Sequence, residues 1–242
     1  MATIAIYSLK GGVGKTTLAV NLAWCAATLS ARQTLLWDLD PQAASTFLLG
    51  ARKAKDSAQA VFTKDVAPEK LVVPTAIQRL SLLGADSSLR GLDVLFHELD
   101  KKKLLTKLLA QLARDYDRML LDCPPGITET SDQVMRAADL IVVPVIPSPL
   151  AERAFAEVAD KLGKRAALMP VHVMVDKRRK LHAEALAEHP DWPVIPMASL
   201  IETMAAKRAP VGAFAPRSAA AQAFQALWTA IEKRLAEAAA KR

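Results

Sequence analysis

A short stretch near the start of the chain, rich in glycine and lysine, has the residue types needed to bind phosphate. It reads Lys10-Gly11-Gly12-Val13-Gly14-Lys15-Thr16-Thr17 and lies between two apolar runs. This order is typical of a strand, a loop and a helix, in which loop N–H groups and the positive end of the helix bind phosphate oxygens. In such a loop Lys15 contacts the β- and γ-phosphates, and the Thr16 hydroxyl ligates Mg²⁺. The alternative is a glycine-rich turn without a ligand.

The stretch departs from the common phosphate-loop pattern G-x-x-x-x-G-K-[ST] at the first position. That pattern requires glycine at position 9, where this chain has Leu9. A second lysine, Lys10, begins the loop instead, and most of the functional expectation depends on this departure.

Aspartates follow two other apolar runs of the strand type. One run ends in Asp122, before Cys-Pro-Pro-Gly, and the other ends in Asp38-Leu-Asp40-Pro. A carboxylate at the tip of a buried strand beside a phosphate loop is placed to hold Mg²⁺, which favours this role for Asp122. Asp38 and Asp40 alternate to the same side of their strand, which suits a site with Mg²⁺ and an attacking water. The alternatives are a helix-capping or turn aspartate at 122 and an Asp-Pro turn at 40.

Strand-like and helix-like segments alternate along the chain and must position these residues. The expected strands are Thr3–Ser8, Thr34–Asp38, Leu80–Leu83, Arg118–Asp122, Leu140–Val145, Val171–Val175 and Val194–Ile195. The expected helices are Lys15–Leu29, Asp100–Tyr116, Thr130–Ala137, Leu150–Leu168, Lys180–Glu188 and Ser218–Lys241. Several strands are continuous apolar runs, which is typical of a parallel sheet buried on both faces. The sequence therefore predicts an α/β fold, a three-layer doubly wound and mostly parallel sheet.

Composition indicates a globular protein, since 52% of the residues are hydrophobic and 24% are charged. Residues 1–242 are expected to form a single domain, with an irregular excursion over Ala51–Pro74. A net charge of +7 favours acidic partners such as nucleic acid or anionic lipid. Cys25 and Cys123 are too few for a disulfide framework or a metal cluster, which fits a reducing cytoplasm. No apolar run approaches the ~20 residues that span a bilayer, and no signal peptide is expected.

These motifs, in this order, resemble the deviant Walker A ATPases of the ParA/MinD family, and the ParA branch is the nearer one. Three later segments also match ParA-like spacing: Met174-Val175-Asp176, Val194-Ile195-Pro196 and Ala213-Phe214-Ala215-Pro216-Arg217-Ser218. The resemblance covers nearly the whole chain. It implies a P-loop NTPase fold, ATP and Mg²⁺ as cofactors, and a slow ATPase that a partner protein stimulates.

The same resemblance implies roles for individual residues. In that family two protomers enclose two ATP molecules, and the lysine corresponding to Lys10 reaches the nucleotide of the partner. The implied catalytic residues are Lys10, Lys15 and Asp40, of which Asp40 positions the attacking water. The implied metal-site residues are Thr16, Asp38 and Asp122. The implied nucleotide contacts are Gly11, Gly12, Val13, Gly14, Lys15, Thr16 and Thr17, with adenine near Met174 and Pro196.

The resemblance further implies an ATP-dependent homodimer that positions a cargo, namely a plasmid, a chromosome or a protein assembly. The ATP-bound dimer would bind DNA without sequence preference, in a nucleoid-associated, otherwise cytoplasmic state, and a ParB-like activator would trigger hydrolysis. The candidate DNA contacts are Lys177, Arg178, Arg179, Lys180, Lys207, Arg208 and Arg217; for each the alternative is an exposed solvating charge. This chain lacks the arginines usual just after Ile195-Pro196.

Two other functions remain open. A MinD-like ATPase that cycles on a membrane would use the stripe Phe224, Leu227, Trp228, Ile231 and Leu235 as a membrane-lying face. A core-facing stripe is the favoured interpretation, so a membrane partner is not expected. The other alternative is a metabolic or metallocluster-carrying relative, against which the two distant cysteines argue.

Overall fold

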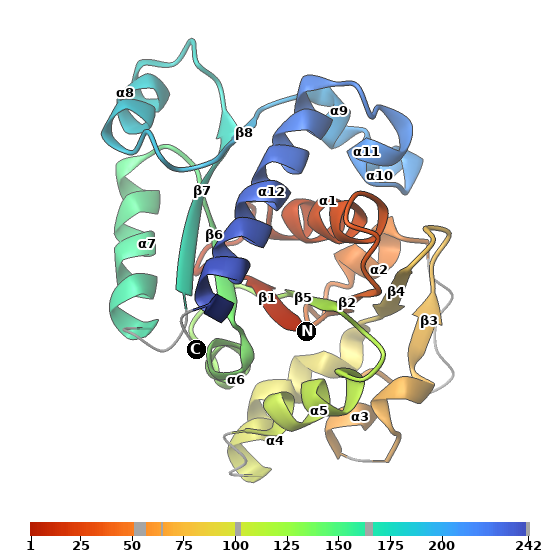
Figure 1. The fold of residues 1–242 in the computed structure, drawn as a ribbon. Helices are drawn as coiled ribbons and strands as arrows, with labels where there is room; N and C mark the ends of the chain where they lie inside the picture. The colour runs from red at the N-terminus through yellow and green to blue at the C-terminus, as the bar shows by residue number, and fades with distance from the viewer. Residues whose placement is uncertain (51–56, 64, 100–102, 163–166, 241–242) are drawn as a thin grey trace.

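A computed structural model of the chain describes residues 1–50, 57–63, 65–99, 103–162 and 167–240. The described residues form an eight-stranded sheet with the order β3-β4-β2-β5-β1-β6-β7-β8 (Figure 1). The strands are β1 (Ala2–Ile6), β2 (Thr34–Asp38), β3 (Val72–Pro74), β4 (Leu80–Leu83), β5 (Arg118–Asp122), β6 (Leu140–Val145), β7 (Ala167–Val175) and β8 (Val194–Pro196). Neighbouring strands are parallel except for the antiparallel pair β3–β4. The predicted mostly parallel sheet is confirmed.

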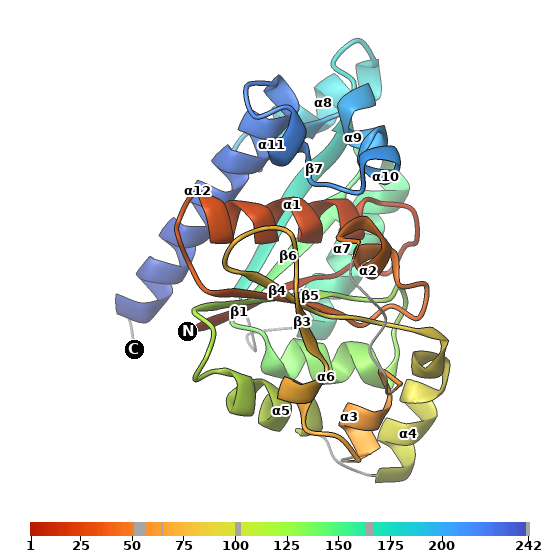
Figure 2. The same cartoon turned by 90° about the vertical axis from the view of Figure 1, so that its right-hand side faces the viewer.

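Helices connect the strands and cover both faces of the sheet. They are α1 (Lys15–Thr28), α2 (Ala44–Leu48), α3 (Ala60–Thr63), α4 (Leu92–Leu99), α5 (Leu104–Leu112), α6 (Glu129–Ala137), α7 (Pro149–Leu162), α8 (Lys180–Glu188), α9 (Ser199–Glu202), α10 (Met204–Lys207), α11 (Val211–Phe214) and α12 (Ala219–Ala240). Figure 2 shows α1 on one side of the sheet and α4, α5 and α6 on the other. This arrangement is the predicted three-layer, doubly wound fold.

Each buried strand contributes side chains to two hydrophobic cores. In β1, Ile4 and Ile6 join the core under α1 and α12, whereas Ala5 and then Tyr7 join the core on the opposite face. This alternation follows from the two-residue period of a strand. It explains why the sequence shows continuous apolar runs, because both faces of these strands are covered.

The register of the central strands places the predicted site residues at one edge of the sheet. Ile6 at the end of β1 pairs with Asp122 at the end of β5, and Asp122 pairs with Asp38 at the end of β2. The loop that follows β1 therefore starts beside both carboxylates. Ligands of open α/β sheets bind at this edge, outside the carboxyl ends of the strands.

Several predicted boundaries are wrong. Residues 167 and 168 were expected in a helix ending at Leu168, but they begin β7, where Ala167 pairs with Leu140 of β6. A short apolar run fits either element, and pairing with a central strand decides it. Helix α5 ends at Leu112 instead of Tyr116, and residues 100–102 lie outside the described residues.

Several short elements were not predicted, namely α2, α3, α4, α9, α10, α11 and β3. Helix α4 precedes the expected start of the helix at Asp100. Strand β3 forms the antiparallel edge of the sheet within the stretch predicted to be irregular, of which residues 51–56 and 64 lie outside the described part. All of these elements are short, and short elements give weak periodic signals.

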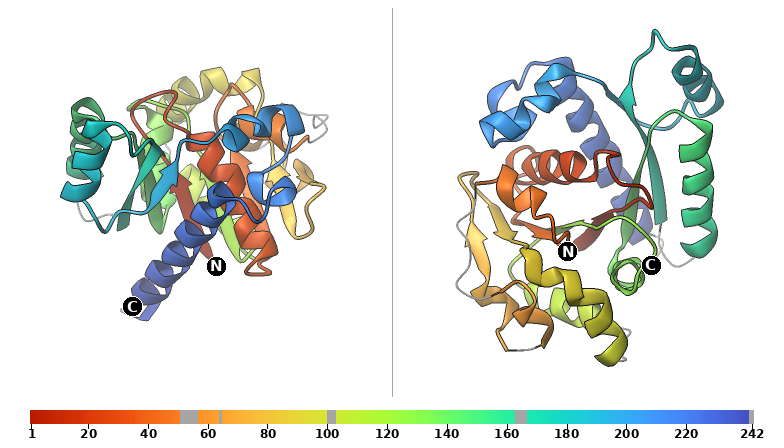
Figure 3. Two further views of the ribbon diagram at one scale, coloured as in Figure 1. Left: turned by 90° about the horizontal axis from the view of Figure 1, so that it is seen from above. Right: turned by 180° about the vertical axis from the view of Figure 1, so that it is seen from behind.

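The C-terminal helix packs against α1, and its far end reaches past the sheet (Figures 1 and 3). Phe224, Leu227, Trp228 and Ile231 are buried in the core, and Leu235 packs against it. The core-facing interpretation of this stripe is therefore confirmed. Among the described residues, none of the helices has the length and apolar content required to cross a membrane.

Candidate functional site

The loop between β1 and α1 is open at its glycines and leads into a helix whose N-terminus has no side-chain cap. Gly12 and Gly14 have φ angles of 72° and 85°, which favour glycine. Gly14 is also the N-cap of α1, and no side chain caps this helix. A side chain added at Gly11 or Gly12 would meet no atom within 4 Å. An uncapped helix N-terminus beside an open glycine loop is suited to bind an anion such as phosphate.

Lys15 lies inside this loop with its ammonium group close to the backbone. Its side chain is buried, and Nζ donates a hydrogen bond to the Lys10 carbonyl at 3.1 Å. Burial lowers the pKa of Lys15, while the carboxylates of Asp122 and Asp40 act in the opposite direction. The amine is thus held next to two acids at the edge of the sheet.

Asp38 and Asp122 are fully buried and directly paired across β2 and β5. Burial raises the pKa of Asp38 to about 7, and the nearby charge of Asp122 adds to this effect. Burial also raises the pKa of Asp122 to about 6, against the lowering effect of the Ser45 and Thr16 hydroxyls. Two like charges so close together favour a bound cation or a shared proton.

The two aspartates use their oxygens differently. Asp38 Oδ2 accepts from the Thr46 backbone N–H at 2.9 Å and from its hydroxyl at 2.8 Å, and Asp38 Oδ1 accepts from the Asp40 N–H. Asp122 Oδ2 accepts from the Ser45 hydroxyl at 2.7 Å. Asp122 Oδ1, in contrast, is buried and has no hydrogen-bond partner among the described residues.

This unpartnered oxygen is the observation that tests whether Mg²⁺ fits. No group of three or more His, Cys, Asp or Glu side chains in the described part of the chain could hold a metal. Mg²⁺ is commonly held by one or two carboxylates, with waters and substrate phosphates as its other ligands. Asp122 Oδ1 therefore fits such a cation better than Asp38, whose oxygens are already occupied, and the Thr16 hydroxyl lies close to the Asp122 carboxyl group.

These groups border one hollow, which we call the polar hollow, with a volume of about 700 Å³. Its lining consists of Gly11, Gly12, Gly14, Lys15, Thr16, Thr17, Asp40, Pro41, Gln42, Pro124, Pro125 and Met174. The structure therefore brings the predicted loop and Asp40 together. Val13 is buried and does not line the hollow, and Lys10 borders the loop without lining it.

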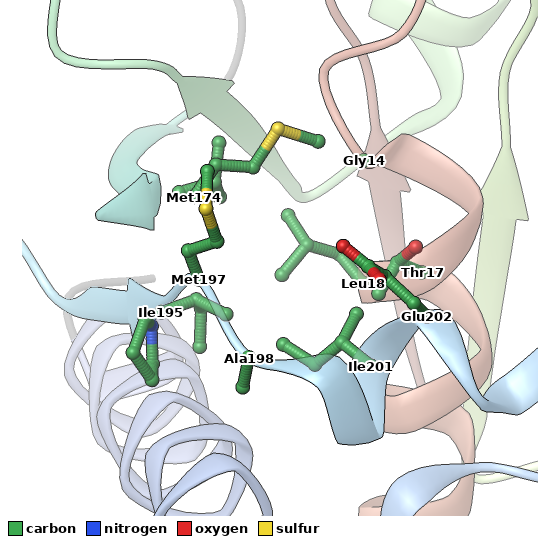
Figure 4. Close-up of a pocket in the computed structure, with 11 residues that line it drawn as sticks. Gly14, Thr17, Leu18, Met174, Ile195, Met197, Ala198, Ile201 and Glu202 are labelled. Carbon is green, nitrogen blue, oxygen red and sulfur yellow. The ribbon is translucent and has the colours of Figure 1, made fainter. Parts of the chain in front are cut away.

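A second and smaller hollow, the apolar hollow, adjoins the first and has a volume of about 130 Å³. It shares Gly14, Thr17 and Met174 with the polar hollow, and its other lining residues are Leu18, Val173, Ile195, Pro196, Met197, Ala198, Ile201 and Glu202. Figure 4 shows Met174 reaching toward Gly14, with Met197 and Ile195 on the same side and Leu18 and Ile201 opposite. Its apolar walls suit a flat ring, and the predicted residues Met174 and Pro196 both line it.

Met174 has an unusual backbone for this position. Its φ angle is 54°, in the left-handed region that non-glycine residues rarely adopt, and the β7–β8 register is irregular between His172 and Val175. This bulge redirects the strand where it meets the two hollows. Backbone strain of this kind gathers at functional sites.

The predicted DNA contacts are all exposed and lie on separate segments. Lys177, Arg178 and Arg179 precede α8, Lys180 begins it, Lys207 and Arg208 end α10, and Arg217 precedes α12. Several of them have partners within the chain. Arg178 forms a two-point ion pair with Asp176, and Lys180 Nζ lies 3.7 Å from Glu184. The Arg208 guanidinium lies 4.4 Å from the centre of the Phe47 ring.

Sequence reasoning missed the polar residues that hold the aspartates. Ser45 and Thr46 lie at the start of α2, shortly after Asp40, and bind Asp122 and Asp38. Their only sequence signal is a Ser-Thr pair a few residues after an Asp-Pro turn. The apolar residues Met197 and Ile201 carry no chemical signal, so only the fold reveals that they line a hollow.

Comparison with known proteins identifies the family to which the chain belongs. A family model described as an AAA domain matches residues 1–166. The chain is 35% identical to the sporulation initiation inhibitor protein Soj of Bacillus subtilis over 146 residues, covering 59% of this chain and 57% of that protein. It is 34% identical to the chromosome partitioning protein ParA of Myxococcus xanthus over 145 residues, covering 59% and 51% of the two chains. The chain thus aligns with only about half the length of these curated relatives.

One solved structure shows the same fold over nearly the whole chain. The septum site-determining protein MinD of Pyrococcus horikoshii, complexed with Mg-ADP, superposes with a TM-score of 0.82 at 23% identity. The match covers 97% of each chain. The loop, the paired aspartates and these relatives agree, and the chain belongs to the ParA/MinD family of P-loop ATPases, whose cofactors are ATP and Mg²⁺.

Proposed function

We propose that this chain binds Mg²⁺-ATP across the two hollows, hydrolyses it, and uses the reaction to position a cargo. One observation carries the nucleotide part of the proposal. The uncapped glycine loop, Lys15 and the unpartnered Asp122 oxygen meet at a single hollow, which gives phosphate and a cation complementary partners at adjacent positions. The proposed ATPase unit spans residues 1–242.

The loop and Lys15 would bind the phosphates. Gly11, Gly12 and Gly14 offer N–H groups, and Lys15 would exchange its bond with the Lys10 carbonyl for bonds with phosphate oxygens. The adenine ring would occupy the apolar hollow between Met174, Pro196 and Leu18. In this arrangement Val13, which is buried, supports the loop by packing, while Thr17 borders both hollows.

The aspartates would have different roles, one in holding the metal and another in orienting the attacking water. Thr16 and Asp122 would hold Mg²⁺, which supplies positive charge to the β- and γ-phosphates when it is bound. Asp40 borders the polar hollow with a carboxylate that could orient the attacking water. Asp38 would act from behind this site, since its Oδ1 accepts from the Asp40 N–H and thereby fixes the Asp40 backbone.

Lys10 would contact the nucleotide that is bound to a second subunit. No hydrogen bond or ion pair of its side chain is present in the described part of the chain, and the adjacent Gly11 and Gly12 are exposed. In an ATP-dependent homodimer such a lysine would cross the interface and stabilise charge on the γ-phosphate of the partner's nucleotide. ATP would then hold the dimer together, and hydrolysis would release it.

The proposal that the chain positions a cargo is supported by the names of its relatives and by its net positive charge. Proteins named for chromosome partitioning are similar to this chain, and the chain carries a net charge of +7. The exposed residues Lys177 to Lys180, Lys207, Arg208 and Arg217 would give the ATP-bound dimer a non-specific, salt-sensitive affinity for DNA. In a bacterial cell the dimer would then associate with the nucleoid within the cytoplasm, where a ParB-like, cargo-bound activator would trigger hydrolysis.

A binding and turnover experiment tests the proposal. Purified protein is titrated with ATP in the presence of Mg²⁺, and phosphate release is then measured with and without DNA. We expect saturable binding and slow release, both lost in Lys15→Ala. Wild-type protein that binds no ATP in Mg²⁺ would overturn the proposal.

A further inference from the structure

Tyr7 links the strand that begins the glycine loop to the loop that follows Asp122. Its side chain is fully buried, although it ends in a polar hydroxyl. The hydroxyl donates a hydrogen bond to the Gly126 carbonyl at 2.8 Å across 119 residues of sequence. A buried hydroxyl without a partner would cost stability, so this bond also fixes the orientation of the ring.

The sheet and the core hold Tyr7 in place, so the Tyr7 end of this hydrogen-bonded link is rigid. Its backbone N–H donates to the Val142 carbonyl in the sheet, and its ring lies in the core on the face opposite α1. The next residue, Ser8, accepts from the Lys10 N–H and connects the strand to the head of the glycine loop. Burial raises the pKa of Tyr7 to about 12, so the hydroxyl remains a donor at neutral pH.

The loop that follows Asp122 and contains Gly126, at the other end of this link, makes few hydrogen bonds of its own. Pro124 and Pro125 line the polar hollow, and proline has no N–H with which to anchor itself. Gly126 turns the chain with a φ angle of 96°, which favours glycine. The Cys123 N–H is bound to the Ile6 carbonyl, and Thr128 and Ser131 form a capping box at the start of α6. Residues 124–127 lie between these two anchors. The bond from the Tyr7 hydroxyl to the Gly126 carbonyl is the only hydrogen bond that these four residues make in the described part of the chain.

We propose that the Tyr7 hydroxyl is a positioning group for hydrolysis: through the Gly126 carbonyl it holds Pro124 and Pro125 at a fixed distance from the glycine loop. The inference rests on the proposed function, because the two prolines and the loop face each other across the hollow assigned to the phosphates. The hydroxyl itself does not reach the reacting atoms. It acts by keeping the wall of the hollow in place while the γ-phosphate and the attacking water are aligned.

The test compares Tyr7→Phe with Tyr116→Phe, since these are the two tyrosines of the chain. The first variant keeps the ring and removes the hydroxyl. The second removes the hydroxyl of a partly buried tyrosine that precedes β5, at the opposite edge of the sheet. Amide hydrogen exchange over residues 126–131 is measured without nucleotide, followed by the affinity for a non-hydrolysable ATP analogue and by steady-state turnover.

For Tyr7→Phe we expect exchange over residues 126–131 to become about fivefold faster and turnover to fall about fivefold, the effect of losing one positioning hydrogen bond. Affinity for the analogue should change less than about twofold, because the loop and Lys15 are untouched. Tyr116→Phe should match the wild type in all three measurements. Unchanged exchange over 126–131, or faster exchange with unchanged turnover, would overturn the inference.

The two proposals fail in different ways. A wild-type protein that binds no Mg²⁺-ATP would overturn the proposed function, whereas the exchange measurement needs no nucleotide and still tests the bond. A wild-type protein that hydrolyses ATP normally, with a Tyr7→Phe variant identical to it, would leave the function standing and remove the role of Tyr7.

Discussion

The polar hollow and the exposed basic residues are both charged regions, yet their charges are held in different ways. Lys15 and Asp122 are buried, and neighbouring central strands fix their positions. Arg178 and Lys180, in contrast, have side chains that are 90% and 88% exposed and are paired with acids of their own segment. The core determines where the first set lies, whereas the side chains of the second set are exposed to solvent. Substitutions in the polar hollow should therefore have large and specific effects, and those at the basic residues should have small and additive ones.

The largest expected effect is that of Lys15→Ala. This side chain is the buried cation of the glycine loop, and its loss leaves the phosphates without their positive partner. We expect ATP affinity to fall at least about 100-fold, measured by calorimetric titration in Mg²⁺. An affinity within about threefold of the wild type would show that the hollow is not the phosphate site.

Lys10→Ala should separate binding from turnover. The side chain of Lys10 does not line the polar hollow of its own subunit, so nucleotide affinity should stay within about threefold of the wild type. Turnover stimulated by DNA and an activator should fall by about 10- to 100-fold, as expected on removing a cation that acts across an interface. Normal turnover in this variant would contradict the cross-interface role.

Asp122→Asn should act in opposite directions on stability and on the response to Mg²⁺. In the nucleotide-free protein the substitution removes one of two buried, paired carboxylates, so Tm should rise by a few degrees. The gain in ATP affinity on adding Mg²⁺ should be lost, an effect of about tenfold. Asp139→Asn, at the amino end of β6, serves as the control. A variant that keeps the full Mg²⁺ response would rule out Asp122 as a metal ligand.

Burial also distinguishes His172 from exposed charges. Both of its ring nitrogens are buried without a hydrogen-bond partner in the described part of the chain, although the rings of His189 and Trp192 lie close by. Burial lowers the pKa of His172, whereas an unfolded histidine titrates near about 6.5. As pH falls below about 6.5, the unfolded chain therefore takes up the proton first, and the contribution of His172 to the free energy of unfolding decreases until the lowered pKa is passed.

Denaturant titrations between pH 7.5 and about 5 measure this effect. Asp38 and Asp122, whose pKa values burial raises to about 7 and about 6, act in the opposite direction and are present in the variant as well as in the wild type. His172→Phe should therefore retain more of its unfolding free energy at pH 5, relative to pH 7.5, than the wild type does. His97→Gln, at an exposed position on α4, serves as the control. Equal slopes for His172→Phe and the wild type would show that His172 is not the group responsible.

The smallest expected effects are those of the basic residues. Single alanine substitutions at Lys207 or Arg217 should weaken DNA binding by about two- to fivefold and reduce the salt slope by about one unit each. Arg178→Ala should have less effect, because its guanidinium is already paired with Asp176. Fluorescence anisotropy at two salt concentrations measures both quantities. A loss of more than about 50-fold from one of these changes would indicate a built DNA site.

Features that depend on neighbouring residues could be predicted from the sequence, whereas features that join distant residues could not. The glycine loop, Asp122 and the parallel sheet could be predicted, because glycine spacing and long apolar runs are local signals of sequence. The bonds of Ser45 to Asp122 and of Tyr7 to Gly126 could not, since each joins residues far apart in sequence that only the fold brings together. The start of β7 at Ala167 was missed for the same reason, as pairing with β6 decides between strand and helix.

The central claim is that nucleotide and assembly form one switch, in which Lys10 of each subunit completes the site of the other. Sedimentation velocity in saturating Mg²⁺ and a non-hydrolysable ATP analogue tests it most directly, with the nucleotide-free protein of 26.1 kDa as reference. The account predicts a species of about twice that mass when the analogue is bound and the single chain when it is absent. A single chain that has bound the analogue to saturation would contradict the account.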